Sequence, residues 1–407
     1  MKKNQFIFGW ILLVVSLMFV GYLGAGSEKV GLFGITGLAI GYVMQRSRFG
    51  FAGIVRKMYK MGNSDLPKAV MFLLAISVVA SASLQYYGHT KGITIPGMSS
   101  VKTISMLTVI GAFIFGIGMM FAGGCASGTL TDLGEGYGRA AITLLFFCLG
   151  SVLGVAHLDT LKPSVLGKGF KYYFPDHFGY FWSLVIFLTF YGILYLLVTK
   201  YEATRKAKGT YIKEEYQDWE KSHEIKPDYK IFSTETYHNL FVKRWSFYTG
   251  GALLSILFIT MVASTGKNWG VTTEFAYWGG RMLKFIGMES YVNSIGFFQS
   301  EKVVNIMNHG VLDNAASVRN IGIIFGTIIA SLLAGGLTIT KDMNLRKVIA
   351  YILGGLFMGY GARLASGCNI GAFYSALSQM SLSGIVFGGF LILGGIVGLK
   401  LSDKFDI

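Results

Sequence analysis

The chain contains little of what soluble enzymes and secreted domains depend on. Of its 407 residues only 14% are charged, against about a quarter in soluble domains. Its three cysteines and six histidines are scattered, without the spacing of a zinc site or a disulfide framework. These shortages argue against a soluble globular domain, a disulfide scaffold and a resident metal centre.

Two motifs that would indicate enzyme chemistry are also missing from the sequence. No Cys-x-x-Cys pair is present, so there is no local dithiol motif for redox chemistry. The glycines of Gly134-Glu-Gly-Tyr-Gly are not a phosphate loop, because no strand precedes them and no Lys-Ser/Thr follows. We therefore expect no bound cofactor, no nucleotide hydrolysis and no enzyme activity.

Apolar residues, in contrast, are abundant. They make up 53% of the chain, and the mean hydropathy is +0.54. They gather in long runs that reach or approach the roughly 17–25 residues of a membrane-spanning helix. The runs are Phe6–Gly24, Ala69–Leu84, Ile104–Phe121, Ala140–Val155, Phe181–Val198, Phe247–Val262, Ile321–Leu337, Val348–Tyr360 and Ile385–Leu399. We interpret the first run as a retained helix, since no Ala-x-Ala cleavage site follows it.

A tenth segment, Val30–Met44, is shorter and rich in glycine. It either crosses the membrane or enters it without crossing. The pattern predicts an all-α membrane protein, a polytopic bundle of about 9–10 transmembrane helices. Glycine pairs spaced for close helix packing support this fold: Gly37/Gly41, Gly150/Gly154, Gly355/Gly359 and Gly394/Gly398.

The net charge of +15 lies in the loops between apolar runs. This is the positive-inside pattern of a protein in a lipid bilayer, not a stripe that binds nucleic acid. Three regions follow: a first membrane half (1–200), a charged cytoplasmic connector (201–244) and a second membrane half (245–407). A less polar connector from about 264 to 319 contains an amphipathic stretch, which we expect at the interface or dipping into the membrane.

A turn is repeated in the two halves. Phe121-Ala-Gly-Gly-Cys125-Ala-Ser-Gly128 recurs as Leu364-Ala-Ser-Gly-Cys368-Asn-Ile-Gly371, and each copy closes a glycine-rich apolar run. Aligning the two cysteines also superposes Gly111 on Gly354, Gly116 on Gly359, Gly118 on Gly361, Ala122 on Ala365, Gly124 on Gly367 and Gly128 on Gly371. A duplicated membrane half with a thiol at equivalent points indicates a transport pathway.

The turn sequence suggests how such a pathway would hold its cargo. Broken helix ends expose backbone N–H groups that favour anions, and a thiol suits a soft sulfur atom. The alternative is that Cys125 and Cys368 are small buried residues, as we expect for the unrepeated Cys148. Five apolar runs separate the two turns if all ten cross. This odd offset predicts inverted pseudo-repeats, with short re-entrant helices at the turns.

Charged residues near the turns have two interpretations each. Arg363, just before Cys368, either faces the same cavity or reaches to the membrane interface. Arg46 and Arg48 either gather anions at the mouth of the pathway or only mark the cytoplasmic side. We expect Glu135 to pair locally with Arg139.

Four segments resemble the YeeE/YedE family of thiosulfate transporters. They are Arg363-Leu-Ala-Ser-Gly-Cys368-Asn-Ile-Gly, Ala122-Gly-Gly-Cys125-Ala-Ser-Gly, Gln45-Arg-Ser-Arg-Phe-Gly-Phe-Ala-Gly and Trp269-Gly-Val-Thr-Thr-Glu-Phe-Ala-Tyr-Trp-Gly-Gly. Length and the Thr-x-Glu-Phe stretch are closer to the long YedE-type members, some of which are linked to selenium metabolism.

The resemblance implies a pseudo-symmetric bundle in a bacterial inner membrane, in which cysteines pass thiosulfate inward by contacting its sulfur. It also implies a cytoplasmic sulfur-carrier protein as partner. Gly50 stands where family members commonly have a further cysteine. The candidate substrate-binding residues are Cys125, Cys368, Gly124, Gly367, Arg363 and Asn369, and the candidate pathway entrance is Arg46, Arg48 and Gly50.

Three functions remain open from the sequence. The first is a transporter for a small inorganic anion, thiosulfate or a selenium compound. The second is an intramembrane thiol oxidoreductase, which requires Cys125 and Cys368 within disulfide reach. The third is a membrane subunit of an enzyme complex that docks through the connector.

Overall fold

The computed structural model of the chain describes residues 3–216, 220–221, 233–340 and 343–405. This part is all-α apart from one two-stranded ladder, β1 (Ile104–Ser105) with β2 (Gly169–Phe170). In it, nine spans are long and apolar enough to cross a membrane, which confirms the predicted helical membrane protein. The central part of the 201–244 connector lies outside the described residues.

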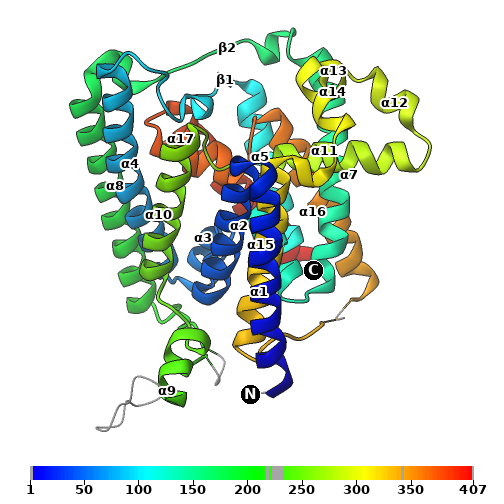
Figure 1. Cartoon of the computed structure of the whole chain (residues 1–407). Coiled ribbons are helices and arrows are strands. Elements are labelled where there is room, and N and C mark those ends of the chain that lie inside the picture. The colour runs from blue at the N-terminus through cyan, green and yellow to red at the C-terminus, as the bar shows by residue number, and fades with distance from the viewer. Residues whose placement is uncertain (1–2, 217–219, 222–232, 341–342, 406–407) are drawn as a thin grey trace.

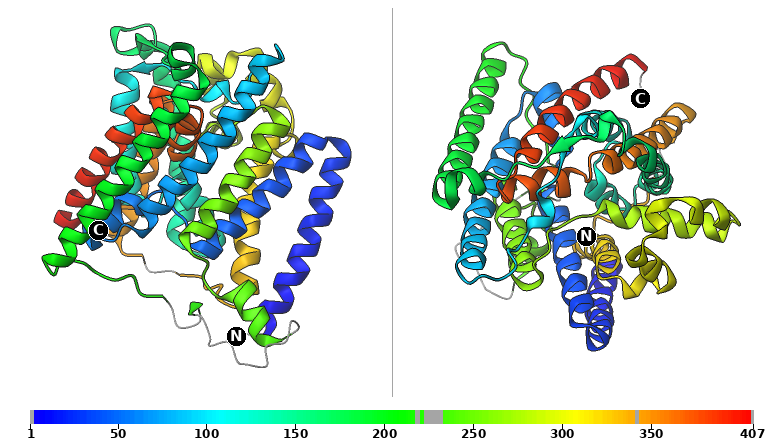
Figure 2. Two further views of the ribbon diagram at one scale, coloured as in Figure 1. Left: turned by 90° about the vertical axis from the view of Figure 1, so that its left-hand side faces the viewer. Right: turned by 90° about the horizontal axis from the view of Figure 1, so that it is seen from above.

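Seven of the nine spans are single helices and two are interrupted at the cysteine turns. The single helices are α1 (Lys3–Gly26), α4 (Asp65–Thr90), α7 (Gly138–Leu161), α8 (Phe174–Ala207), α10 (Phe247–Thr265), α15 (Ala315–Leu333) and α18 (Leu382–Phe405). Of these, α8 is kinked at a non-helical Gly179 (φ 68°). The interrupted spans contain the cysteine turns: α5 (Met106–Ala122) with α6 (Ala126–Gly134), and α16 (Leu345–Leu364) with η7 (Asn369–Tyr374) and α17 (Ser375–Ser378). Helices α1 and α8 lie at the periphery of the bundle (Figure 2).

The glycine-rich tenth segment forms α2 (Glu28–Ser47), a helix of 20 residues. A helix of this length extends about 30 Å, enough to cross the apolar layer. It is longer than the apolar run in the sequence because polar residues at both ends continue it. Helix α2 lies beside α15, and Gly37 and Gly41 face Arg319 and Ile323 of that helix.

The spaced glycines lie where helices cross. A Cβ atom at Gly150 of α7 would lie 2.5 Å from the Leu356 oxygen of α16, and one at Gly355 of α16 would lie 2.5 Å from the Thr143 oxygen of α7. Gly394 and Gly398 of α18 meet Phe113 and Ile117 of α5 in the same way. Since no side chain larger than hydrogen fits these crossings, the glycines allow the backbones to approach closely.

Short elements cover the two ends of the bundle (Figure 1). One end, called the α12 end, carries β1, β2, α11 (Thr272–Phe285), α12 (Glu289–Ser294), α13 (Gly296–Gln299) and α14 (Glu301–Asn308). The opposite end, called the α9 end, carries the N-terminus and α9 (Thr234–Tyr237). The remaining short helices are α3 (Gly53–Arg56), η1 (Lys57–Met61), η2 (Met98–Ser100), η3 (Val165–Gly167), η5 (His238–Val242) and η6 (Val311–Asp313).

Helix α15 begins earlier than its apolar run. The side chain of Asn314 accepts hydrogen bonds from the backbone N–H groups of Ala316 and Ser317, at 2.9 and 3.4 Å. This cap starts the helix at Ala315. Arg319, which the sequence left at the end of a connector, therefore lies in a buried helix. The main buried core surrounds both cysteines and includes Phe115, Phe147 and Tyr374.

Candidate functional site

The two cysteine turns have the same local shape. Helix α5 ends at a left-handed Gly123 (φ 75°), whereas the residue of this kind after α16 is Ser366 (φ 58°). Each cysteine then adopts extended backbone and begins the next short helix. The carbonyls of Cys125 and Cys368 each accept a 2.7 Å hydrogen bond, from the N–H groups of Thr129 and Ala372. Gly123 adopts this left-handed conformation without strain, whereas Ser366 adopts it at a steric cost.

Helices α5 and α16, which carry the turns, pack against each other in opposite directions. A Cβ atom at Gly111 would lie 2.7 Å from the Gly361 oxygen, and one at Gly118 would lie 2.8 Å from the Gly354 oxygen. Residue numbers rise along one helix as they fall along the other. Because Gly111 aligns with Gly354 and Gly118 with Gly361 in the repeat, the contact is reciprocal.

Both thiols are buried, with exposed fractions of 1% for Cys125 and 0% for Cys368. All three cysteines of the chain are free. Cys125 Sγ lies 3.5 Å from Ser127 Oγ. Cys368 Sγ accepts from the backbone N–H groups of Ile370 and Gly371, and it interacts electrostatically with Cys125. The turn therefore presents a soft sulfur together with backbone donors.

A cavity of about 210 Å³ opens to Cys125 from the α9 end of the bundle. We call it the Cys125 cavity. Its wall includes Arg48, Gly50, Gly53, Gly123, Gly124, Gly128, Asp132, Glu135 and Arg139. Gly124 and Gly50 thus line the same cavity as the thiol, and a Cβ atom at Gly50 would meet nothing within 4 Å.

The charges of the Cys125 cavity are paired with one another. Arg48 bonds Glu135 at 2.5 Å and Glu220 at 2.8 Å, and Arg139 bonds Asp132 at 2.8 Å. The expected Glu135–Arg139 pair is therefore wrong. The chain reverses at Gly136 (φ 90°), which brings Asp132 to the start of α7 and directs Glu135 toward Arg48. Burial raises the pKa of Glu135, although Arg48 opposes this shift.

Arg46 lies farther from the thiols, at the junction with the connector. Its buried guanidinium donates to the carbonyls of Val242 and Lys243, and its own carbonyl accepts from Trp245 N–H at 2.9 Å. Arg46 thereby joins the end of α2 to the segment that leads into α10. It is not among the residues that line the Cys125 cavity.

Arg363 lies inside the protein with 7% of its surface exposed. It donates to Thr272 Oγ1 at 2.7 Å and to Thr273 Oγ1 at 3.4 Å, and it interacts electrostatically with Cys368. Asn369 Nδ2 lies 3.3 Å from Met119 Sδ. Gly367 separates the two segments and packs against Ala372. The predicted residues around Cys368 are thus brought together.

Two functional candidates were missed from the sequence, Arg319 and Glu274. Arg319 is 2% exposed, donates to the Gly270 carbonyl and lies 5.1 Å from the centre of the Phe33 ring. Glu274 is 6% exposed and accepts from Ser317 Oγ at 2.8 Å. Both interact electrostatically with the Arg363–Cys368 group. Recognising Asn314 as a helix cap would have placed Arg319 within the bundle.

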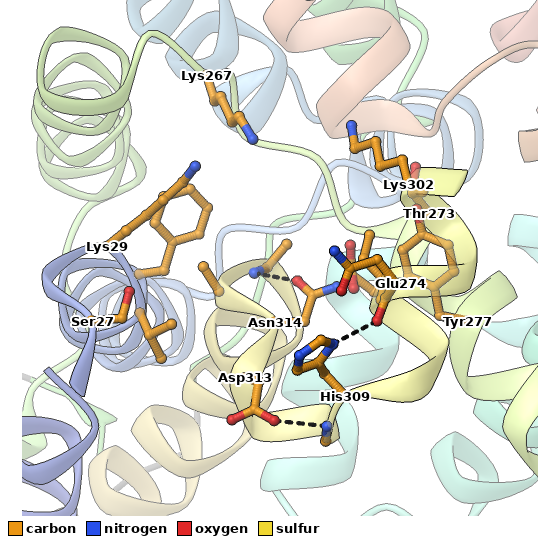
Figure 3. Close-up of a pocket in the computed structure, with 17 residues that line it drawn as sticks. Ser27, Lys29, Lys267, Thr273, Glu274, Tyr277, Lys302, His309, Asp313 and Asn314 are labelled. Carbon is orange, nitrogen blue, oxygen red and sulfur yellow. Dashed lines mark hydrogen bonds between the residues drawn. The ribbon is translucent and has the colours of Figure 1, made fainter. Parts of the chain in front are cut away.

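A larger cavity of about 560 Å³, called the vestibule, lies at the α12 end (Figure 3). Its lining includes Ser27, Lys29, Phe33, Lys267, Thr273, Glu274, Tyr277, Lys302, His309, Asp313 and Asn314. Helix α2 lines the vestibule with Lys29 and Phe33 and the Cys125 cavity with Met44. The two cavities therefore lie near opposite ends of this helix. Thr273 and Phe33 connect the vestibule to Arg363 and Arg319.

A bundle of membrane-length helices, with two buried polar turns between cavities at opposite ends, defines the chain as a membrane transporter. The chain belongs to the sulphur transport family, which it matches over residues 46–397.

Three relatives illustrate this family. The thiosulfate transporter TsuA of Escherichia coli is 26% identical over 379 residues, covering 88% of this chain and 91% of the relative. TsuA of Spirochaeta thermophila is 25% identical over 378 residues, covering 88% and 95%. The probable transporter YedE of Escherichia coli is 28% identical over 165 residues, covering 40% of each chain.

Proposed function

We propose that this protein carries a small sulfur-containing anion, most specifically thiosulfate, across a bacterial inner membrane. The observation that carries the proposal is the pair of buried thiols in matching turns, with buried guanidinium groups beside one of them. Two relatives aligned over most of their length are thiosulfate transporters. Thiosulfate joins a soft terminal sulfur to hard oxygens, which matches a site of thiols and N–H donors.

Unsatisfied donors near Cys368 support an anion as the cargo. Within the described residues, the buried Nε atoms of Arg319 and Arg363 and Nε1 of Trp269 have no hydrogen-bond acceptor. Trp269 adjoins the same turn, since its carbonyl accepts from Ser375 Oγ at 2.9 Å. A buried donor without a partner costs about 1–3 kcal/mol. An oxyanion that passes this point would supply the missing acceptors.

The proposal includes inverted repeats, a first half (1–200) and a second half (245–407). Its support is the reciprocity of helix contacts. The contact of α5 with α18 has a counterpart in the contact of α16 with α7. The contact of α2 with α15 has a counterpart in the contact of α10 with α4. Under this relation α5 corresponds to α16 and α7 to α18, so both cysteine turns face one central constriction. The connector (201–244) would then lie in the cytoplasm, available to a sulfur-carrier protein.

Substitution of the thiols tests the proposal. Cys125→Ala and Cys368→Ala should each abolish uptake of ³⁵S-thiosulfate by cells that contain normal amounts of the protein in the membrane. Cys148→Ala is the matched control, because Cys148 is a buried residue inside α7 that belongs to neither turn and does not line the Cys125 cavity. Full uptake by both turn variants would show that the thiols only pack. Uptake of selenite by cells that contain the protein but take up no thiosulfate would favour a selenium compound as cargo.

A further inference from the structure

Glu274 is a buried carboxylate at the inner wall of the vestibule (Figure 3). It belongs to α11 and directly follows Thr272 and Thr273, the residues that hold Arg363. Its carboxylate accepts a hydrogen bond from Ser317 Oγ at 2.8 Å. Within the described part of the chain it forms no ion pair closer than 4 Å. A buried acid without a close counter-ion is costly in its charged form, so its presence here indicates a functional role.

The groups that face Glu274 come from four parts of the chain. Arg319 and Ser317 belong to α15, Arg363 to α16, and Tyr277 and Arg281 to α11 itself. Lys267 approaches from the segment before α11. The vestibule also carries Lys29, Lys302, His309 and Asp313 around its rim.

The central charges do not balance when a dianion arrives. Arg319 and Arg363 are the buried cations, and Glu274 is the buried anion beside them. Together they leave one positive charge. A bound dianion such as thiosulfate would change the net charge of the site from one positive to one negative. A net charge is unfavourable in a buried site that water solvates poorly. One proton on Glu274 restores neutrality.

We propose that Glu274 binds one proton whenever a dianion occupies the arginine site, so that the protein moves the anion together with a proton. This inference rests on the proposed function. An anion next to a carboxylate favours the protonated acid. By reciprocity, protonation of the acid strengthens binding of the anion by the same factor. The proton enters from the vestibule. It leaves with the anion toward the Cys125 cavity, and the carboxylate is then charged again beside the two guanidiniums.

The surroundings of Glu274 in the unliganded site already shift its pKa upward. Burial raises the pKa of Glu274, whereas the Ser317 hydroxyl and the Arg319 and Arg363 guanidiniums lower it, and the net shift is upward. A dianion would raise the pKa further. Binding of the dianion should therefore be accompanied by uptake of a proton by Glu274.

Proteoliposomes that contain the full-length protein and a lumenal pH dye test the proposal, with ³⁵S-thiosulfate as the probe. Wild-type protein should accumulate thiosulfate when the outside is acidic, and added thiosulfate should acidify the lumen. Glu274→Gln should transport at the same rate with and without the proton gradient and should not acidify the lumen. Asp313→Asn is the matched control, an exposed carboxyl of the same vestibule, and should behave as wild type.

A second variant keeps the carboxylate. Ser317→Ala removes the hydroxyl that donates to the charged form, so the pH midpoint of uptake should rise by roughly half a unit to one unit. Accumulation driven by protons in Glu274→Gln, or an unchanged midpoint in Ser317→Ala, would overturn the inference. Wild-type transport of thiosulfate without proton movement would overturn it and leave the proposed function intact. Wild-type protein that neither binds nor moves thiosulfate would overturn both.

Discussion

Replacing Arg319 by methionine should raise the thiosulfate concentration for half-maximal uptake by about 10- to 100-fold. Arg319 is almost fully buried, and its Nε atom has no acceptor among the described residues. A hydrogen bond between a charged donor and its acceptor contributes about 1.5–3 kcal/mol, and 1.4 kcal/mol is about a tenfold change in affinity. Methionine fills most of the space and removes the charge.

The assay is the initial rate of ³⁵S-thiosulfate uptake over a range of concentrations, normalised to the folded protein in the membrane. Arg346→Met is the matched control, because Arg346 is exposed at the start of α16. Arg319→Lys keeps the charge but not the planar fork, so it should recover part of the lost affinity.

A structural role for Arg319 makes a different prediction. The guanidinium also holds the Gly270 carbonyl. If this were its whole function, both Arg319 variants would lower the melting temperature and leave the half-saturating concentration unchanged. Wild-type affinity in folded Arg319→Met protein would refute an anion contact at this residue.

Three further predictions concern the cavities and the helix crossings. Gly50→Cys should fold and transport normally, because nothing lies within 4 Å of a Cβ atom there, and its thiol should react with a thiosulfonate reagent that enters the Cys125 cavity. A cysteine at Lys208 should resist a membrane-impermeant maleimide applied outside intact cells, whereas one at Lys302 should react, and the reverse pattern would invert the proposed topology. Gly355→Val should lower the melting temperature in detergent at a cost of about 1–3 kcal/mol or more, whereas Gly389→Val, which meets no atom within 4 Å, should not.

Local pattern was sufficient for much of the fold. Apolar runs predicted the membrane-length helices, since nothing but helix satisfies the backbone of such segments in lipid. Glycine spacing predicted close helix crossings, because the residues that permit close approach must themselves repeat at helical spacing. The spacing did not predict that α7 would cross α16 or that α5 would cross α18. The cysteine turns were visible for a similar reason, as each is a short contiguous motif.

Partnerships between distant segments could not be predicted in the same way. Glu135 lies near Arg139 in sequence, yet it pairs with Arg48 from α2 and leaves Arg139 to Asp132. The central group of Arg319, Glu274 and Arg363 draws on α15, α11 and α16. Arg363 was a candidate from the sequence, but Arg319 and Glu274 each look like ordinary charges in a connector, and only the packing of three helices brings the group together.

The two halves match in their thiols but differ in their charges, and this difference bears on direction. On the Cys125 side, Arg48 and Arg139 are bonded to carboxylates. On the Cys368 side, Arg319 and Arg363 donate to neutral carbonyl and hydroxyl oxygens, and the vestibule adds Lys29, Lys267 and Lys302. An anion is therefore attracted from the α12 end and meets a nearly neutral surface beyond Cys125, where it is held less strongly. If the connector is cytoplasmic, as we propose, this gradient of binding favours uptake into the cell.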